Sequence, residues 1–158
     1  MRALVASIVL LLIGCSKPTK QPQVVAALEK LADAPSKMVL YSLNPEDHHD
    51  GGLHTDTVFH SFGILGKAEI TDSNEQRTLL RALARGASEN DDHAAACFNP
   101  RHALHIEENG QSLDFTICFE CLQVQTQGFQ PGGFLTSDSP QLTFDQSLRT
   151  HHLPLATK

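Results

Sequence analysis

Large aromatic side chains and positive charge are both scarce in this chain. The 158 residues include no Trp and one Tyr, and 12 Lys and Arg stand against 18 Asp and Glu, for a formal net charge of −6. The basic residues do not cluster anywhere along the sequence. Because nucleic-acid binding depends on concentrated positive charge, we expect no nucleic-acid partner.

Long hydrophobic runs are also missing, since nothing approaches the roughly 20 apolar residues that a membrane-spanning helix needs. The longest apolar stretch, residues 3–13, follows Arg2 and is only about 11 residues long. A positive residue followed by a short apolar run is typical of a secretory signal.

The apolar run ends in the sequence LIGC, which resembles a lipobox. Gly14 supplies the small residue that the signal peptidase needs, and Cys15 supplies the thiol that accepts lipid. An ordinary signal peptide that happens to contain a cysteine is the alternative. We predict that residues 1–14 are removed and that lipid on Cys15 holds the protein at a membrane. Ser16, rather than Asp, favours the periplasmic face of an outer membrane.

Residues 15–36 are expected to form a lipid-anchored tether with a short helix, and residues 37–156 a single domain. The segment 15–23 is polar with two prolines, as in a flexible linker. Apolar residues at helical spacing follow in 24–33. That helix could pack on the domain or continue the stalk.

The first half of the domain shows strand and helix patterns. A strand is predicted over 37–43 and stopped by Asn44-Pro45. A polar surface loop over 46–56 and an extended segment over 58–70 come next. Asp72 or Ser73 can then cap a helix, whose expected buried stripe is Leu79, Leu80, Leu83 and Ala87.

A hairpin in the second half can be placed in register from its turn, Asn109-Gly110. That turn sets Leu104 opposite Phe115 and His102 opposite Ile117, and it leaves His105 and Asp114 facing each other on the other side. We interpret this last pair as a surface cross-strand pair rather than an acid/base dyad.

Two further elements are expected after the hairpin. Residues 122–125 are predicted to prolong its second strand past a bulge. A last helix is predicted to start near Ser139-Pro140 and to face Leu142, Phe144 and Leu148 inward. The order of elements indicates an α+β fold, a small antiparallel β-sheet with two or three helices packed on one face.

With Cys15 used by lipid, three cysteines are left: Cys97, Cys118 and Cys121. An odd number cannot all be paired within the chain. The favoured interpretation is a disulfide from Cys97 to Cys118 or Cys121, because exported proteins favour disulfides. The third thiol would then be a small buried apolar group.

The hairpin register also brings His102 to the end of the hairpin that holds the cysteines. Three thiolates and one imidazole, from Cys97, His102, Cys118 and Cys121, would suit Zn or Cu. A redox pair of Cys118 with Cys121 is a further alternative, although such pairs usually sit at a helix N-terminus.

A second metal candidate lies in the polar loop, where imidazoles and carboxylates are close in sequence. Because the spacings match no ligand motif, a solvated loop is favoured over a divalent-ion site. The candidate ligands are His48, His49 and His54, with Asp50, Asp56 and His60 nearby.

The segments Cys97-Phe98-Asn99-Pro100-Arg101-His102 and Ile117-Cys118-Phe119-Glu120-Cys121 resemble a family of uncharacterised bacterial proteins, many of them predicted lipoproteins. Members share a CF-x-PRH segment and an ICFEC segment, and the likeness spans most of the chain after the leader. Many relatives carry Gly where this chain has Ala103. The resemblance implies no activity; it implies only that the two segments belong together.

The sequence contains no nucleophile elbow, phosphate-binding glycine loop or paired-carboxylate motif, so no catalytic residue is assigned. The favoured function is a membrane-anchored bacterial lipoprotein serving as a non-catalytic structural or interaction module of the cell envelope. The alternatives are a Zn- or Cu-binding lipoprotein and, less favoured, a thiol-disulfide enzyme.

Overall fold

The computed structural model describes residues 21–34, 36–51 and 54–157. Within these residues, seven strands form one antiparallel sheet in the order β2-β3-β1-β4-β5-β6-β7, and three helices accompany it. This arrangement confirms the α+β prediction. The elements are α1 (Pro22–Ala32), β1 (Lys37–His48), β2 (Val58–Phe59), β3 (Phe62–Ile70), α2 (Ser73–Glu89), β4 (His102–Glu108), β5 (Gln111–Cys118), β6 (Gln123–Gln127), β7 (Phe134–Leu135) and α3 (Gln141–Thr150).

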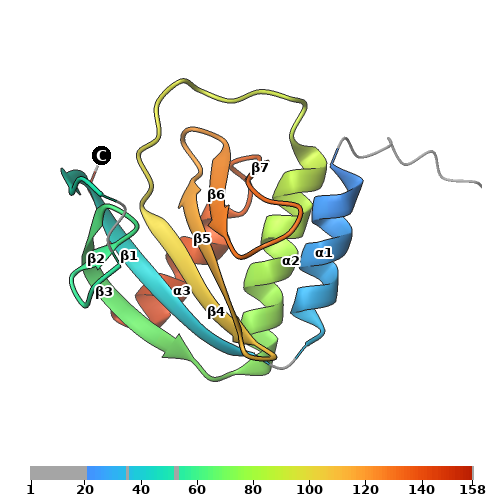
Figure 1. Ribbon diagram of the computed structural model, residues 1–158, viewed down its shortest axis with the longest axis horizontal. Helices are drawn as coiled ribbons and strands as arrows, with labels where there is room; N and C mark the ends of the chain where they lie inside the picture. The colour runs from blue at the N-terminus through green and yellow to red at the C-terminus, as the bar shows by residue number, and fades with distance from the viewer. Residues whose placement is uncertain (1–20, 35, 52–53, 158) are drawn as a thin grey trace, which may run out of the picture.

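The three helices cover one face of the sheet (Figure 1). The main core lies between the two layers, where Leu28 of α1, Leu83 of α2 and Phe144 of α3 are fully buried with Phe115 of β5. Helix α1 therefore packs on the domain instead of continuing a stalk, and the packed unit begins before residue 37. The predicted signal peptide and Cys15 lie outside the described residues. Among the described helices, none combines the length and the hydrophobicity needed to cross a membrane.

The hairpin of β4 and β5 has the register that the Asn109-Gly110 turn predicts. Leu104 pairs with Phe115, His102 with Ile117, and His105 with Asp114. Because side chains alternate along a strand, the first two pairs face the helices and the third faces away from them.

Strand β1 continues through Pro45 to His48, so the prediction that Asn44-Pro45 ends it was wrong. Pairing of β1 with β4 ends at Ser42, and the register with β3 slips between Asn44 and His48. Pro45 therefore lies in an irregular stretch with a neighbour on one side only. Strands tolerate the missing N–H of proline in such places.

Residues 122–125 do not prolong β5. The chain reverses after Cys118, and β6 returns antiparallel to β5, with Cys118 paired with Gln123. Leu122 takes the left-handed conformation (φ 58°), which glycine or asparagine usually occupies. Without either residue here, the sequence shows no turn signal.

Helix α2 begins as predicted, because the Asp72 side chain accepts hydrogen bonds from the backbone N–H groups of Asn74 and Glu75. In α3, Phe144 and Leu148 are buried as expected, but Leu142 is 77% exposed. Phe144 and Leu148 are four residues apart and share one face of the helix. Leu142 lies two residues before Phe144, on the opposite side.

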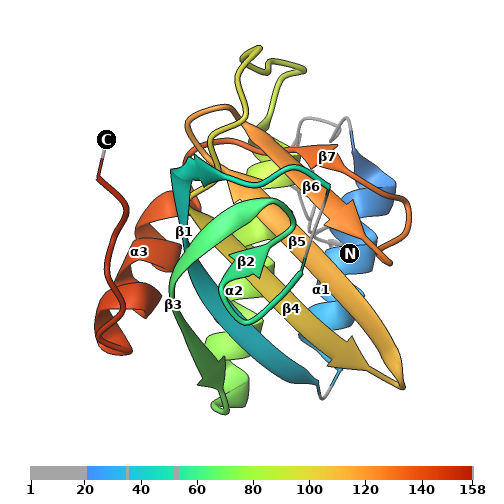
Figure 2. The ribbon, with the colours of Figure 1, turned by 60° about the vertical axis from the view of Figure 1, so that its left-hand side comes forward.

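The sheet face away from the helices is partly covered by the chain itself. The β2–β3 hairpin lies across this face in front of β4 and β5 (Figure 2). A second apolar cluster forms beneath it, around Tyr41, Leu43, Phe59, Phe62 and Ala103. We call this side the open face.

The contrast within α3 gives a matched pair of substitutions. We expect Leu148→Ala to lower the free energy of unfolding by about 2–5 kcal/mol, because it opens a cavity in the core. Leu142→Ala, on the same helix, is expected to change it by less than about 0.5 kcal/mol. Urea denaturation of both variants checks this, and equal losses would show that α3 packs with a different face.

Candidate functional site

Asp114 lies at the centre of a polar cluster on the open face. Its Oδ1 is 2.6 Å from Nδ1 of His105, and its Oδ2 is 2.6 Å from Nε2 of His60. The side chains of Asp114, His60 and His105 are 12%, 13% and 20% exposed. One carboxylate thus binds two mostly buried imidazoles, one on each oxygen.

Two parts of the fold bring these residues together. His105 and Asp114 are direct partners in the β4–β5 ladder. His60 comes from the turn between β2 and β3, which reaches Asp114 because that hairpin lies over the open face (Figure 2). His60 and Ser61 both have positive φ, 43° and 78°. Paired positive φ values are typical of the two-residue hairpin turn, but they are uncommon for residues other than glycine, asparagine and aspartate.

His54 completes the cluster from the loop before β2. Its ring centroid lies 5.3 Å from that of His60, 6.0 Å from that of His105 and 4.8 Å from that of Phe59. One potential ligand atom from each of His54, His60 and Asp114 lies within 4.8 Å of the other two. In the part of the chain that the structure describes, this is the one such group of His, Cys, Asp or Glu.

Hydrogen bonds from two sides select one tautomer of the His60 ring. The Gln127 amide Nε2 donates to Nδ1 of His60 over 2.9 Å, so the ring proton lies on Nε2 and is donated to Asp114. Burial raises the pKa of Asp114, but the hydrogen bonds from His60 and His105 outweigh it and hold the pKa below its ordinary value. Asp114 is therefore ionised at neutral pH.

The surroundings act on two more groups of the cluster. Burial lowers the pKa of the His54 imidazole, and the Asp114 charge opposes this only in part. Burial, with the Asp114 carboxylate next, raises the pKa of Tyr41, whose ring lies 6.3 Å from that of His54. Near pH 7 the cluster consequently presents one carboxylate, a neutral His54 and a neutral phenol.

Two imidazoles and one carboxylate form a donor set that proteins use for Zn²⁺ and for other divalent transition metals. His105 would stay on the far oxygen of Asp114, in the place of the hydrogen-bonding partner that usually orients a ligating carboxylate. The arrangement can therefore bind a cation with three protein ligands and one supporting imidazole.

Of the three histidines predicted as weak metal candidates, the structure places only His54 in this group. The His48 ring packs on Phe62 at a centroid distance of 5.2 Å, and His49 lies 3.1 Å from Asp47. His60 was noted near the loop, and the register paired His105 with Asp114. No signal in the sequence showed that the hairpin reaches over the sheet to join the two sets.

The cysteines pair differently from the favoured prediction. Cys118 and Cys121 form a disulfide, and Cys97 is a free, exposed thiol. His102 does not join them: its Nε2 lies 2.8 Å from Oδ1 of Asp145 in α3. The cause is strand parity, because His102 shares the helix-side face with Ile117, and Cys118 points to the open face. The four-residue Zn or Cu set is therefore not gathered here.

The two cysteine-bearing segments, 97–102 and 117–121, contact each other. Arg101 Nη1 donates to Glu120 Oε2 over 2.6 Å, and the rings of His102 and Phe119 lie 5.3 Å apart. The Cys97 sulfur lies 3.5 Å from the Cys121 sulfur. The two segments are therefore neighbours in the fold, at one end of the β4–β5 hairpin.

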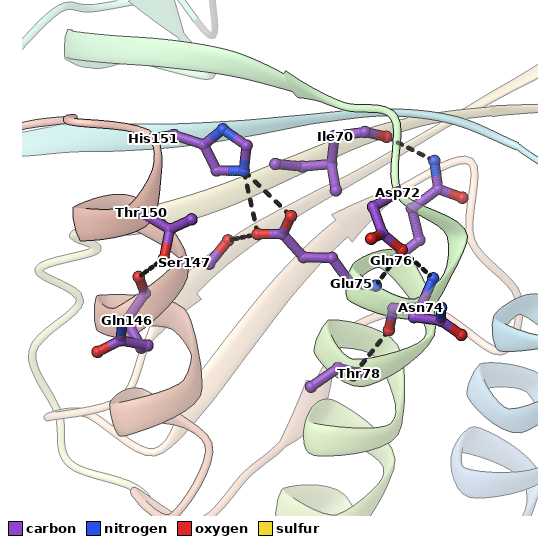
Figure 3. Close-up of polar contacts among 10 residues, drawn as sticks. All are labelled: Ile70, Asp72, Asn74, Glu75, Gln76, Thr78, Gln146, Ser147, Thr150 and His151. Carbon is purple, nitrogen blue, oxygen red and sulfur yellow. Dashed lines mark hydrogen bonds and ion pairs between the residues drawn. The ribbon is translucent and has the colours of Figure 1, made fainter.

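A separate polar cluster joins α2 to α3 (Figure 3). Glu75 accepts a hydrogen bond from Ser147 over 2.5 Å, and both of its carboxylate oxygens lie 3.1 Å from Nε2 of His151. In a nucleophilic triad the histidine stands between the hydroxyl and the acid. Here the acid lies between the other two, so the order differs from that of a triad. The bonds of Glu75 instead hold α2 against α3 and its C-terminal end.

Comparisons of the chain with protein-family models, curated proteins and solved structures found no match.

The role of Asp114 in the fold can be separated from its role in ligand binding. In metal-free protein, we expect Asp114→Asn to lower the free energy of unfolding by about 1–3 kcal/mol, because two imidazole N–H groups lose a charged acceptor and one of them then faces the amide NH2. The matched control is Asp91→Asn. Asp91 also lies beside an imidazole, at 2.8 Å from His93, but both side chains are at least 76% exposed.

Loss of that exposed pair should change the unfolding free energy by less than about 0.5 kcal/mol. Urea denaturation at pH 7 with a chelator present measures both variants. A loss for Asp114→Asn as small as that expected for the control would mean that the open-face cluster does not stabilise the fold.

Proposed function

We propose that this chain is a lipid-anchored envelope protein whose domain binds a divalent transition-metal ion through His54, His60 and Asp114. The observation that carries this proposal is the approach of three potential ligand atoms to within 4.8 Å of one another. This ligand set differs from the one predicted around the cysteines and retains His54 from the polar-loop candidate.

The distances suit a small cation. Bonds of about 2.0–2.1 Å in a tetrahedral site place neighbouring ligand atoms roughly 3.3–3.5 Å apart. His60 Nε2 and Asp114 Oδ2 are closer, at 2.6 Å, because a proton lies between them. An entering ion would displace that proton and separate the two atoms by less than about 1 Å.

The surroundings favour binding in a defined geometry. Gln127 orients His60 from Nδ1, and His105 orients Asp114 from Oδ1. Phe59 is fully buried beside the rings of His54 and His60, at centroid distances of 4.8 and 4.7 Å, and shields one side from water. Two of the three proposed ligands are thus held before an ion arrives.

Three protein ligands leave a coordination position for water or another donor. His54 is the exposed member of the group, so solvent can reach the group from the side of His54. Such a site suits reversible loading and transfer of an ion better than permanent structural binding, because structural zinc sites are closed by four protein ligands. We therefore propose metal binding and handling as the function.

The membrane anchor is a proposal from the leader sequence. The LIGC motif and the polar segment after Cys15 support lipid attachment followed by a linker to the domain. Ser16 supports a location at the periplasmic face of the outer membrane.

Metal binding is tested on the full-length protein, extracted in detergent and treated with a chelator. Titration calorimetry with Zn²⁺ should show one equivalent bound, and Co²⁺ should give a visible absorption band of a low-coordinate site. His60→Ala and Asp114→Asn should each weaken Zn²⁺ binding by at least about 100-fold, since each removes a ligand.

His93→Ala is the matched control, because His93 is an exposed histidine paired with Asp91 outside the cluster. It should bind Zn²⁺ as the unaltered protein does. Equal affinity in all four proteins, or no binding at all, would contradict the proposed function.

Anchoring is tested by Cys15→Ser in the bacterial cell. We expect the unaltered protein to fractionate with membranes and to yield an acylated N-terminal Cys15 peptide by mass spectrometry. The variant should keep residues 1–14, because the lipoprotein peptidase acts on lipidated cysteine. Cleavage of the variant at the same bond would show that the leader is an ordinary signal peptide.

A further inference from the structure

Three sulfur atoms meet at the turn between β5 and β6. The Cys118–Cys121 disulfide is buried, with the two residues 1% and 0% exposed. Cys97 is an exposed free thiol, and its Sγ lies 3.5 Å from Sγ of Cys121. A reduced cysteine that touches one sulfur of a disulfide is the arrangement from which exchange starts.

The backbone supplies hydrogen bonds to both sulfurs of the disulfide. The N–H of Asn99 donates to Cys121 Sγ over 3.3 Å, and the N–H of Cys121 donates to Cys118 Sγ over 3.1 Å. Hydrogen bonds to a charged group favour its charged form. Each sulfur would therefore be stabilised as a thiolate when it becomes the leaving group.

We propose that Cys97 is an exchange port, through which external low-molecular-weight thiols react with the buried cysteine pair. In the first step the Cys97 thiolate attacks Cys121 Sγ. A Cys97–Cys121 bond forms, the Cys118–Cys121 bond breaks, and Cys118 leaves as a thiolate. Cys118 takes up the proton that Cys97 released, so this step needs no oxidant or reductant.

The second step connects the pair to solvent. After the first step, one sulfur of the disulfide belongs to the exposed Cys97. The thiolate of a small thiol attacks that sulfur, a mixed disulfide with Cys97 forms, and Cys121 leaves as a thiolate. Run in reverse, a small disulfide oxidises the buried pair by the same route. The substrate class is a small thiol or its disulfide.

This route explains why three cysteines occur together. In a Cys-x-x-Cys redox pair, the first cysteine is usually reactive and exposed at a helix N-terminus. Here Cys118 ends a strand and is buried. Cys97, from a segment distant in sequence, supplies the exposed thiol instead.

The test compares full-length protein with its Cys97→Ser variant during reduction by glutathione. Thiols at Cys118 and Cys121 are trapped by alkylation in acid and counted by mass spectrometry. Without the Cys97 thiol, the rate at which these two thiols appear should fall by at least about ten-fold. In denaturant, where the disulfide is accessible in both proteins, the two rates should be equal. Equal rates in the native state would overturn the proposal.

A second variant tests the exchanged bond directly. Cys118→Ser leaves Cys97 and Cys121 as the two thiols of the cluster, and oxidised glutathione should join them within one chain. Two thiols that stay reduced or carry only glutathione, in protein whose circular dichroism matches the original, would contradict the first step. If this variant does not fold, the native-state rates of Cys97→Ser decide the matter alone.

Discussion

The antiparallel pairing of β4 with β5 is the constraint on which both chemical sites depend. Its register alternates side chains between two environments: Leu104 and Phe115 enter the core under the helices, whereas His105 and Asp114 face the other side. A shift by one residue would exchange the two sets. It would place a carboxylate in the core and phenylalanine on the open face, so burial of the apolar set fixes the position of the polar one.

This pairing also shows which parts of the fold can be predicted from the sequence. Asn109-Gly110 determines the register from local sequence alone, because a two-residue turn leaves one pairing that buries all the apolar residues together. The capped helix α2 follows equally from Asp72 and the leucine spacing. The partnership of His105 with Asp114 was accessible in the same way. The role of this pair could not be predicted, because one hairpin does not distinguish a surface cross-strand pair from half of a binding site.

What could not be predicted depends on long-range geometry. His60 reaches Asp114 only because the β2–β3 hairpin lies over the sheet. The turn of this hairpin consists of a histidine and a serine, so it lacks the glycine or asparagine that marks such turns in a sequence. The reversal at Leu122 is hidden for the same reason, and with it the contact that joins Cys118 to Cys121. Both turns place non-glycine residues in left-handed conformations beside reactive groups, which is where proteins most often retain such backbone.

We propose that the open face binds a divalent metal ion, and the most direct test is a crystal structure of the Zn²⁺-loaded protein with anomalous data at the zinc edge. We expect one strong anomalous peak bonded to a His54 ring nitrogen, His60 Nε2 and an oxygen of Asp114, with His105 on the other oxygen. A peak among Cys97, Cys118, Cys121 and His102, or no peak near Asp114 at saturating zinc, would contradict it.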